Sequence, residues 1–216
     1  MWLVTAGPTR EYLDDVRFLS NASSGRMGYA LARAARARGH EVVLVSGPVE
    51  LPPPDDVRVL PVQSADEMLA VGRQVLAQQP ADCLFGVAAV CDFRPTRRVS
   101  GKPPKERGRF SLELCENPDV LATLAGLGQS RFAAGFALED LGQGPDGLAA
   151  AVARARAKLE RKGLSAIVLN GTETLGAAAA HAYWVEGSGA IEPLQGDKTR
   201  VARLLVQRVE VALESG

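Results

Sequence analysis

The sequence predicts a single α/β domain built on a doubly wound, mostly parallel, Rossmann-like sheet. Short and almost continuously apolar runs recur along the chain, as in strands that are buried on both faces. Patterns typical of helices separate these runs at short intervals, which favours parallel strands joined by crossover helices. The length of 216 residues suits one domain, so we assign residues 1–216 to a single unit with a sizeable core.

The first four strands are predicted from apolar runs bounded by turn residues. Their ranges are residues 2–6, 41–46, 57–62 and 83–90. An alanine-rich helix over residues 29–38 ends at Gly39, a good helix C-cap. A second helix begins after Ser64, where Glu67 completes a capping box.

The second half of the chain adds a loop and a hairpin to this pattern. Residues 94–109 are rich in Pro, Gly, Lys and Arg and lack periodicity, so we expect a flexible basic flap. Further strands are expected over residues 110–114, 131–136 and 165–169, and helices after Asp119, over 148–162 and from Asp197 to about residue 213. Residues 181–194 predict a late β-hairpin that turns at a Gly-Ser-Gly sequence. Neither the flap nor the hairpin is long enough to form a separate domain.

Composition and charge exclude several classes of protein. The 25 Lys and Arg residues balance the 25 Asp and Glu residues, so no overall basic field attracts nucleic acid. The three cysteines lack CxxC spacing, which argues against a disulfide scaffold or a zinc site and favours the reducing cytoplasm. The N-terminus lacks the pattern of a signal peptide, and no apolar run approaches the roughly 18 residues of a membrane span. We therefore expect a cytoplasmic protein that binds neither nucleic acid nor a membrane.

The most informative segment is residues 20–28 (SNASSGRMG), which leads from an apolar stretch into the first helix. Small hydroxyl residues and two glycines allow backbone N–H groups to surround an anion, and the helix N-terminus adds partial positive charge. The segment therefore predicts a phosphate site. The alternative is an ordinary N-cap, because Ser and Asn begin helices for purely local reasons.

Polar or glycine residues follow most of the predicted strands at the point where each strand ends. They lie at residues 5–7, 46–47, 88–92, 135–139 and 169–170. Because the carboxyl ends of parallel strands meet at one edge of the sheet, these residues are expected to form one pocket. Glycine backbone, one aromatic side chain and acids are typical of a nucleotide site, and Gly7 is expected to contribute to it.

Two common nucleotide motifs do not occur where a nucleotide-binding fold would need them. A dinucleotide-binding fold would carry G-x-G-x-x-G directly after the first strand, where this chain has Gly7-Pro8-Thr9. The P-loop pattern G-x-x-x-x-G-K-[ST] does not occur either. The pocket is therefore predicted to bind its nucleotide with a different loop.

Taken together, the motifs resemble those of phosphopantothenate–cysteine ligase, also called phosphopantothenoylcysteine synthetase, an enzyme family of coenzyme A biosynthesis. Residues 16–28 (VRFLSNASSGRMG) are similar to the family's V-R-x-[IL]-S-N-x-S-S-G-x-M-G signature. Residues 5–11 (TAGPTRE) resemble its opening segment, and later family motifs follow in order at residues 45–48, 88–93, 116–119 and 135–137. The resemblance covers most of the chain and weakens after Asn170.

The resemblance implies a two-step ligase reaction. The carboxylate of 4′-phosphopantothenate attacks the α-phosphate of a nucleoside triphosphate, which releases pyrophosphate and leaves an acyl-nucleotide. The amine of L-cysteine then displaces the nucleoside monophosphate and forms an amide. Bacterial members of the family use CTP and eukaryotic members use ATP, so we expect CTP with ATP as the alternative. Mg²⁺ is the implied cofactor.

At the helix entrance, the resemblance implies roles for five residues. Ser23, Gly25 and Gly28 match positions that bind the triphosphate. Asn21 matches the asparagine that contacts the acyl carbonyl of the intermediate, a catalytic role, whereas its local alternative is the helix N-cap. Arg17 matches the arginine that reaches the phosphate of phosphopantothenate, and a dimer interface is one route by which it could do so.

At the strand ends, five further residues are candidates. Asp92 is a partner for the nucleotide ribose or for Mg²⁺, which needs few protein carboxylates when it also binds substrate phosphates. Ala88 and Ala89 are expected to offer backbone groups to the substrate. Phe136 matches the aromatic residue beside the nucleotide base, and Asn170 is placed to read the edge of that base.

The flap carries the other predicted catalytic residue. Lys102 lies ten residues after Asp92, at the position of the family's catalytic lysine, and Lys105 is a second substrate-binding candidate. Lysine suits an oxyanion or phosphoryl group that gains charge during the reaction. The family's usual Lys-Ile-Lys-Lys is replaced here by Lys102-Pro103-Pro104-Lys105. In the last helix, Lys198 is a further candidate to approach the nucleotide.

The resemblance also implies partners and leaves rival functions open. Family members pair as homodimers that share their active sites, and the late hairpin or the strand over residues 110–114 could extend the sheet between subunits. A separate phosphopantothenoylcysteine decarboxylase is expected to supply the next pathway step. One rival function is an NAD(P)-dependent oxidoreductase of the same fold class. The other is a non-catalytic nucleotide-binding module derived from the ligase.

Overall fold

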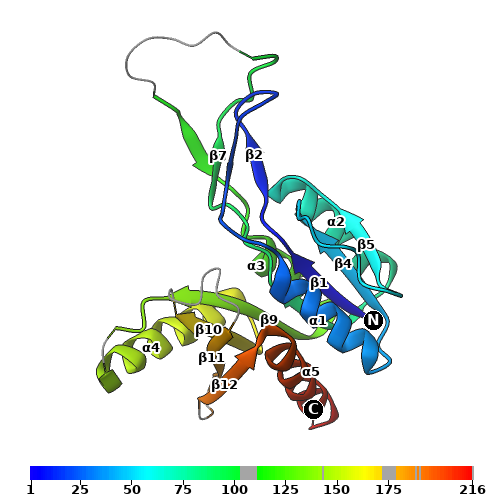
Figure 1. The fold of residues 1–216 in the computed structure, drawn as a ribbon, viewed down its shortest axis with the longest axis vertical. Coiled ribbons are helices and arrows are strands. Elements are labelled where there is room, and N and C mark those ends of the chain that lie inside the picture. Colours follow the sequence, from blue (N-terminus) through cyan, green and yellow to red (C-terminus); the bar gives the residue numbers. More distant parts are fainter. Residues whose placement is uncertain (103–110, 143, 172–178, 188, 190, 216) are drawn as a thin grey trace.

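A computed structural model describes residues 1–102, 111–142, 144–171, 179–187, 189 and 191–215, and these residues form an α/β fold on one large sheet (Figure 1). The eight strands that pair in this sheet within the described residues have the order β12-β11-β10-β9-β6-β1-β4-β5. Their bounds are β1 Trp2–Ala6, β4 Val42–Ser46, β5 Arg58–Pro61, β6 Ala81–Gly86, β9 Ser130–Glu139, β10 Ala166–Gly171, β11 Ala179–Glu186 and β12 Glu192–Asp197.

The order of the strands confirms the predicted doubly wound sheet. Neighbouring strands from β5 to β10 are parallel, whereas β11 and β12 are antiparallel and form the predicted late hairpin. The chain runs outward from β1 through β4 to β5 and then returns to place β6 on the other side of β1. Strand order therefore reverses between β1 and β6, which is where sheets of this kind bind ligands.

Helices cover both faces of the sheet. One face packs against α1 (Arg26–Ala37) and α5 (Lys198–Ser215), and the other packs against α2 (Ala65–Gln78), α3 (Val120–Ala125) and α4 (Gly144–Lys162). Successive side chains of β1 alternate between the two cores, so Val4 lies with α1 and α5 while Leu3 lies with α2 and α3. Among the described helices, none combines the length and apolar character needed to span a membrane.

Local side chains set several of the helix starts. The Ser64 hydroxyl accepts a hydrogen bond from the Glu67 N–H at 3.2 Å, and the Glu67 carboxylate accepts one from the Gln63 N–H at 2.8 Å, as expected of a capping box. Asp119 caps α3 through the Ala122 N–H at 3.1 Å. Asp197 likewise accepts from the Arg200 N–H at 2.7 Å at the start of α5. These three predicted helix starts are confirmed.

Some predicted boundaries were wrong. Helix α1 begins at Arg26, three residues before the predicted start, because the glycine-containing turn already leads into helical backbone. Strand β9 continues to Glu139 because it pairs with β10 throughout residues 134–139. The strand expected over residues 110–114 lies instead at Leu114–Glu116 (β8), and residue 110 is outside the described residues.

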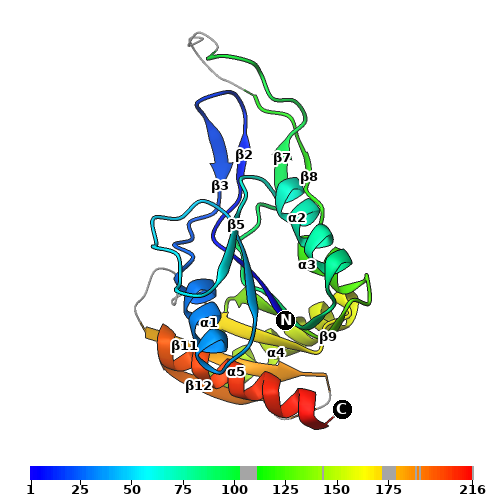
Figure 2. The same cartoon turned by 90° about the vertical axis from the view of Figure 1, so that its right-hand side faces the viewer.

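Two antiparallel arms, which the sequence analysis did not predict, project from one end of the molecule (Figure 2). The first arm pairs β2 (Arg10–Tyr12) with β3 (Phe18–Ser20), and the second pairs β7 (Phe93–Pro95) with β8. They follow β1 and β6 in the chain, so both arise at the point where strand order reverses. Apolar side chains on them are exposed, including Val16, Phe18, Phe93, Val99, Leu112 and Leu114.

Two buried polar residues, Thr9 and Glu11, anchor the β2–β3 arm to the rest of the fold. The Thr9 hydroxyl accepts a hydrogen bond from the Cys91 N–H at 3.0 Å, and the Thr9 carbonyl accepts one from the Ser20 hydroxyl at 2.8 Å. The Glu11 carboxylate accepts from the Ala65 N–H at 3.0 Å, at the N-terminus of α2, where the helix dipole favours a negative charge. The arm therefore extends in a direction set by the sheet and by α2.

The chain crosses itself closely where β1 and β4 end. A Cβ atom at Gly47 would lie only 1.8 Å from the Pro8 carbonyl oxygen, so the crossing requires a glycine. We expect Gly47→Ala to destabilise the fold by about 3 kcal/mol or more, because the clash is with backbone. Urea denaturation measures this loss. Gly187→Ala, where a Cβ would meet nothing within 4 Å, is the matched control, and equal stability of the two variants would contradict the close crossing.

An ionic cluster joins the end of α1 to α5. Arg38 contacts the Glu210 carboxylate at 2.7 Å, and the His40 Nε2 atom lies 2.8 Å from the same carboxylate. The hydrogen bond from Arg38, followed by that from His40, holds the pKa of Glu210 below its usual value. A carboxyl whose pKa is lowered by folding stabilises the fold above its unfolded pKa and loses this contribution as the pH falls.

We therefore expect Glu210→Gln to lower the melting temperature at pH 7, by an amount equivalent to about 1 kcal/mol or less. The difference from the wild type should shrink as the pH falls below about 4.3, the ordinary pKa of a glutamate, because the wild-type carboxyl then becomes progressively protonated as well. Thermal melts at several pH values test this, with the exposed Glu50→Gln as control. A difference that persists unchanged at low pH would show that Glu210 acts through packing and not through its charge.

Candidate functional site

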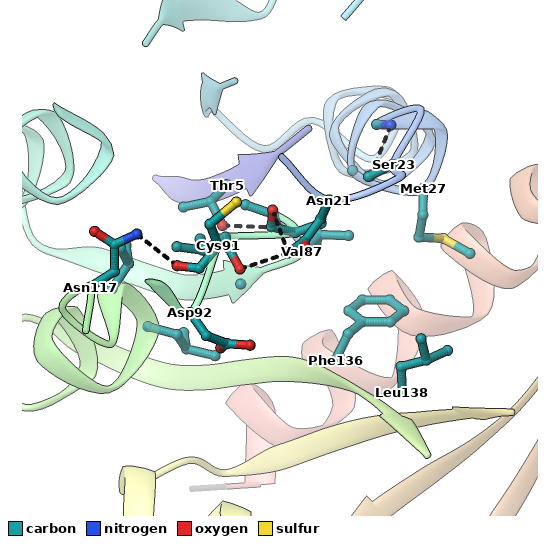
Figure 3. Close-up of a pocket in the computed structure, with 18 of the residues that line it drawn as sticks. Thr5, Asn21, Ser23, Met27, Val87, Cys91, Asp92, Asn117, Phe136 and Leu138 are labelled. Atoms are coloured by element: carbon teal, nitrogen blue, oxygen red, sulfur yellow. Dashed lines mark hydrogen bonds between the residues drawn. The ribbon is translucent and has the colours of Figure 1, made fainter. Parts of the chain in front are cut away.

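A cleft of about 1150 Å³ lies at the carboxyl ends of the central strands, next to the reversal of strand order (Figure 3). Residues 21–28, 86–93 and 116–121 contribute most of its lining. Side chains from β1, β9, β10, α4 and α5 complete it, two of them from β9 and one from each of the others. The ends of β1, β9 and β10 and the segment after β6 therefore meet here as predicted, whereas Ser46 and Gly47 at the end of β4 do not line the cleft.

The serine-glycine segment forms one wall of this cleft and leads into α1. The Ser23 hydroxyl accepts a hydrogen bond from the Gly25 N–H at 3.3 Å, which tightens the turn. Gly25 is the N-cap of α1, adopts a left-handed conformation with φ of 72° and supplies no side chain to cap the helix. The first N–H groups of α1 thus remain available for an anion. The alternative of an ordinary Ser or Asn N-cap is wrong for this helix.

Asn21 links the serine-glycine wall to the segment that follows β6. Its Nδ2 group donates to the Val90 carbonyl at 2.9 Å and lies 3.4 Å from the Ala89 carbonyl. Because both carbonyls only accept hydrogen bonds, the amide nitrogen has to face them and the Oδ1 atom faces away. Figure 3 shows Asn21 in this position within the cleft. The side chain is therefore oriented by backbone on the opposite wall.

Two of the predicted nucleotide-binding glycines serve the packing of α1. A Cβ at Gly28 would lie 2.5 Å from the Ala6 Cβ atom, so this glycine allows α1 to approach β1 closely. Gly7 does not belong to the described lining of the cleft. It lies beneath Gly25, whose ideal Cβ position is 3.4 Å from the Gly7 Cα atom. Gly7 thus supports the turn from below, while Ser23, Gly25 and Gly28 line the cleft.

The side chains of Phe136, Leu138 and Asn170 lie on the same face of neighbouring strands. Val168 pairs with Phe136 and Asn170 pairs with Leu138 in the parallel ladder of β10 and β9. Phe136 is within β9 and not at its end, as we had expected, because β9 extends to Glu139. The Asn170 Oδ1 atom is buried and has no hydrogen-bond partner among the residues that the structure describes. An aromatic ring beside an unpaired acceptor suits a flat, nitrogen-bearing ligand such as a nucleotide base.

Asp92 lines the cleft opposite the serine-glycine wall, and its carboxylate has no ion-pair partner among the described residues. The backbone around it is braced, because the Asn117 N–H donates to the Asp92 carbonyl and the Asn117 side chain donates to the Cys91 carbonyl, both at 2.8 Å. In the described part of the chain, no group of three or more His, Cys, Asp or Glu residues could hold a metal ion. A metal at Asp92 would therefore depend on ligands from a substrate.

Ala88 and Ala89 line the cleft as predicted, but much of their backbone is already occupied. The Ala88 N–H donates to the Thr5 hydroxyl at 3.3 Å. The Ala89 N–H donates to the Gly7 carbonyl at 2.9 Å, and the Ala89 carbonyl accepts from the Thr9 N–H at 3.4 Å. The segment is thereby held in place, and fewer of its polar groups are available to a substrate than the sequence analysis expected.

Three cations line the cleft, and the sequence analysis did not assign two of them. Arg26 and Lys198 are the first residues of α1 and α5, and Lys162 is the last residue of α4. Lys162 pairs with the Asp119 carboxylate at 2.9 Å. Desolvation, followed by the charge of Arg26, lowers the pKa of Lys198. Lys162 carried no signal in the sequence, because a lysine at the end of a helix is ordinarily a solvated terminal residue.

Neither Arg17 nor Lys102 lines the cleft of its own chain. Arg17 lies at the outer end of the β2–β3 arm, next to β3. Lys102 is exposed, in the segment that follows β7. Lys105 lies outside the described residues. The structure therefore separates the predicted site residues into a group in the cleft and a pair on the arms.

Comparison with known proteins identifies relatives over the whole length of the chain. The family model described as DNA/pantothenate metabolism flavoprotein C-terminal domain matches residues 1–212. The coenzyme A biosynthesis bifunctional protein CoaBC of Vibrio cholerae is 40% identical over 199 residues, which cover 88% of this chain and 47% of the relative. The chain thus spans about half the length of the curated relatives that it matches.

Solved structures share the fold. The crystal structure of the C-terminal domain of CoaBC superposes with a TM-score of 0.81 at 34% identity, over 100% of this chain and 96% of that domain. A Cab2 mutant in complex with phosphopantothenate-cysteine has the same fold, with a TM-score of 0.82 at 16% identity, over 99% of this chain and 86% of the other. The resemblance to phosphopantothenate–cysteine ligases is confirmed, and the chain belongs to the DNA/pantothenate metabolism flavoprotein C-terminal domain family.

Proposed function

We propose that this chain is a phosphopantothenate–cysteine ligase of coenzyme A biosynthesis, which joins 4′-phosphopantothenate to L-cysteine at the expense of a nucleoside triphosphate. The observation that carries the proposal is the composition of one cleft. It combines an uncapped helix start for phosphates, an aromatic ring with an unpaired acceptor for a base, and an asparagine held between the two walls. Membership of the family supports the same conclusion.

In the first step, a carboxylate oxygen of phosphopantothenate forms a bond to the α-phosphorus of the nucleotide. The bond from that phosphorus to the bridging oxygen breaks, pyrophosphate leaves, and an acyl-nucleotide remains. Negative charge is shifted onto phosphate oxygens in this step, so fixed donors and cations lower its barrier. The N–H groups at the start of α1, together with Arg26 and Lys198, supply both at one side of the cleft.

In the second step, the amine of cysteine attacks the acyl carbonyl carbon. The bond from this carbon to the phosphate oxygen breaks, the nucleoside monophosphate leaves with that electron pair, and the amine loses its proton as the amide forms. The Asn21 Nδ2 group has two hydrogens; the Val90 carbonyl accepts from it at 2.9 Å, and the Ala89 carbonyl is a weaker acceptor at 3.4 Å. An oxyanion of the tetrahedral intermediate that displaces the contact with Ala89 would receive the second hydrogen bond, and such donors stabilise it.

The nucleotide is proposed to be CTP, with ATP as the alternative. The unpaired Asn170 Oδ1 atom accepts hydrogen bonds only, so it favours a base with an exocyclic amine, as cytosine and adenine have. The choice of CTP rests on the bacterial relatives. Mg²⁺ fits the lone carboxylate of Asp92 if substrate phosphates supply most of its ligands. Bound there, it would neutralise phosphate charge.

The protein is proposed to act as a homodimer. The arms expose apolar side chains, and Arg17 on the first arm lies outside the cleft of its own chain. A second copy that received this arm would cover the apolar surface and bring Arg17 to a cleft that lacks it. The product retains the cysteine carboxylate, so decarboxylation is the proposed next reaction.

The rival functions are less well supported. No G-x-G-x-x-G follows β1, where a dinucleotide-binding fold carries it. Residues 142–147 (GQGPDG) match this pattern later in the chain, but none of the described residues of this segment lines the cleft, which argues against a dinucleotide there. A non-catalytic module would retain nucleotide binding without turnover. The altered Lys102-Pro103-Pro104-Lys105 segment motivates this second rival, and only an activity measurement can reject it.

We expect pyrophosphate release when the protein is incubated with phosphopantothenate, Mg²⁺ and CTP, and amide formation when cysteine is added. UTP, whose base presents a carbonyl where cytosine presents an amine, should support turnover at least tenfold more slowly, because Asn170 Oδ1 would face another acceptor. Pyrophosphate detection and mass spectrometry of the product measure both steps. Nucleotide binding without pyrophosphate release from CTP or ATP would establish the non-catalytic module instead.

Asn21→Asp should separate the two steps. The new carboxylate would face the Ala89 and Val90 carbonyls and lose the donor for the oxyanion, so we expect amide formation to slow by about 10²–10³-fold while the acyl-nucleotide still forms. Quenched-flow mass spectrometry measures the accumulated acyl-nucleotide. Gln78→Glu adds the same charge on the exposed face of α2 and serves as the control. Wild-type amide formation by Asn21→Asp would contradict this role of Asn21.

A further inference from the structure

Two adjacent carboxylates at the outer turn of the β2–β3 arm each bind a different partner. The first, Asp14, is buried and accepts hydrogen bonds from the N–H groups of Val16 and Arg17 at 2.8 and 2.7 Å. Its other oxygen accepts from the Arg17 Nε group at 2.6 Å. The guanidinium of Arg17 is therefore tied to the turn that carries it, although about half of this side chain is exposed.

The second carboxylate, Asp15, binds the segment that leads to Lys102. It accepts hydrogen bonds from the Gly101 N–H at 2.8 Å and from the Arg98 guanidinium at 2.9 Å. Backbone bonds reinforce the contact, because the Asp15 N–H donates to the Gly101 carbonyl at 3.1 Å and the Val99 N–H donates to the Leu13 carbonyl at 2.8 Å. Lys102 is thus one residue from an anchored position.

The ring of Tyr12 and the charge of Asp15 hold Arg98 in place. The Arg98 guanidinium lies 5.0 Å from the centre of the Tyr12 ring, which is a favourable cation–π distance. Hydrogen bonds from Gly101 and then Arg98 hold the pKa of Asp15 below its usual value. The carboxylate is therefore ionised at neutral pH, and the contact to the Lys102 segment is present under the conditions of catalysis.

This network has no role in the cleft itself. None of Asp14, Asp15 and Arg98 lines it. The network instead joins Arg17 and Lys102, two predicted site residues that do not line the cleft, and it does so through neighbouring positions of one turn. An anchored backbone reduces the conformational entropy that Lys102 loses when its ammonium group binds an anion.

We propose that Asp15 is a positioning residue that couples Lys102 to Arg17, so that the two cations act as one unit on the same substrate molecule. This inference rests on the proposed function and on the roles that the family resemblance implies, in which Arg17 holds the phosphate end of phosphopantothenate and Lys102 acts at its carboxyl end. In a dimer, both cations of a given active site then come from the two neighbouring arms of one subunit. They belong to one subunit, whichever subunit supplies the rest of the cleft.

A double-mutant cycle tests the coupling. Asp15→Ala should lower kcat by about 10- to 100-fold, as expected of a misplaced catalytic group, and Asp15→Asn should recover much of this loss because its amide oxygen still accepts from Gly101. In a Lys102→Ala background, Asp15→Ala should have little further effect. An equal loss in both backgrounds would overturn the proposal, because a general destabilisation acts whether or not Lys102 is present. Asp55→Ala, at an exposed acid on the loop between β4 and β5, is the control.

Heterodimers purified with two affinity tags test whether one subunit supplies both cations of a site. A heterodimer of Arg17→Ala and Lys102→Ala subunits should be as inactive as its parents, because each subunit then lacks one of the two cations. Recovery of about half of wild-type activity would overturn the proposal, since it requires the two cations of one site to come from different subunits. If the protein is monomeric, no heterodimer forms and the double-mutant cycle decides the question alone.

Failure of the proposed function and failure of this inference have different signatures. A wild-type protein that releases no pyrophosphate from CTP or ATP would reject the ligase function. A wild-type protein that is active, and whose Asp15→Ala variant matches Asp55→Ala in kcat and KM, would reject only the positioning role. Thermal melts of each variant identify any loss of activity that comes from unfolding.

Discussion

The close approach of α1 to β1 is the constraint on which the rest of the structure depends. Gly28 has no Cβ, so the helix lies directly against Ala6, and the left-handed turn at Gly25 packs on Gly7 beneath it. A side chain at Gly28 would force the helix away from the sheet. The uncapped N-terminus of α1 therefore sits above the carboxyl end of β1, and this places an anion site beside the reversal of strand order.

The predicted site residues therefore lie on two kinds of structure, the rigid core and the projecting arms. The cleft is built on buried strands and helix ends, whose geometry the core maintains. The cations assigned to the acyl substrate lie on short antiparallel arms, which a few specific bonds hold in direction: Thr9 and Glu11 at the base, and Asp15 at the outer turn. Short arms without a core of their own depend on such bonds because each strand contributes few ladder pairs.

The charged side chains are unevenly distributed in the structure, although the net charge of the chain is zero. Lys158 and Arg154 both pair with Glu139, at 2.6 and 2.8 Å, so this carboxylate offsets part of their charge. Arg26 and Lys198 line the cleft without a carboxylate partner in the ion pairs of the described residues. The neutral composition conceals this pair of cations, which come together only when α1 and α5 pack side by side.

The sequence by itself determined the doubly wound sheet, the caps at Ser64 and Asp119 and the serine-glycine wall of the cleft around Ser23, because each is marked by patterns of residues that are close together in the chain. The tertiary structure alone decided that Lys162 enters the cleft and that the arms pair at all. Strands of three residues are too short to show an alternating pattern. Nothing in the sequence at the end of a helix indicates which cavity that end will line. Their positions depend on contacts between distant segments, so only the folded chain determines them.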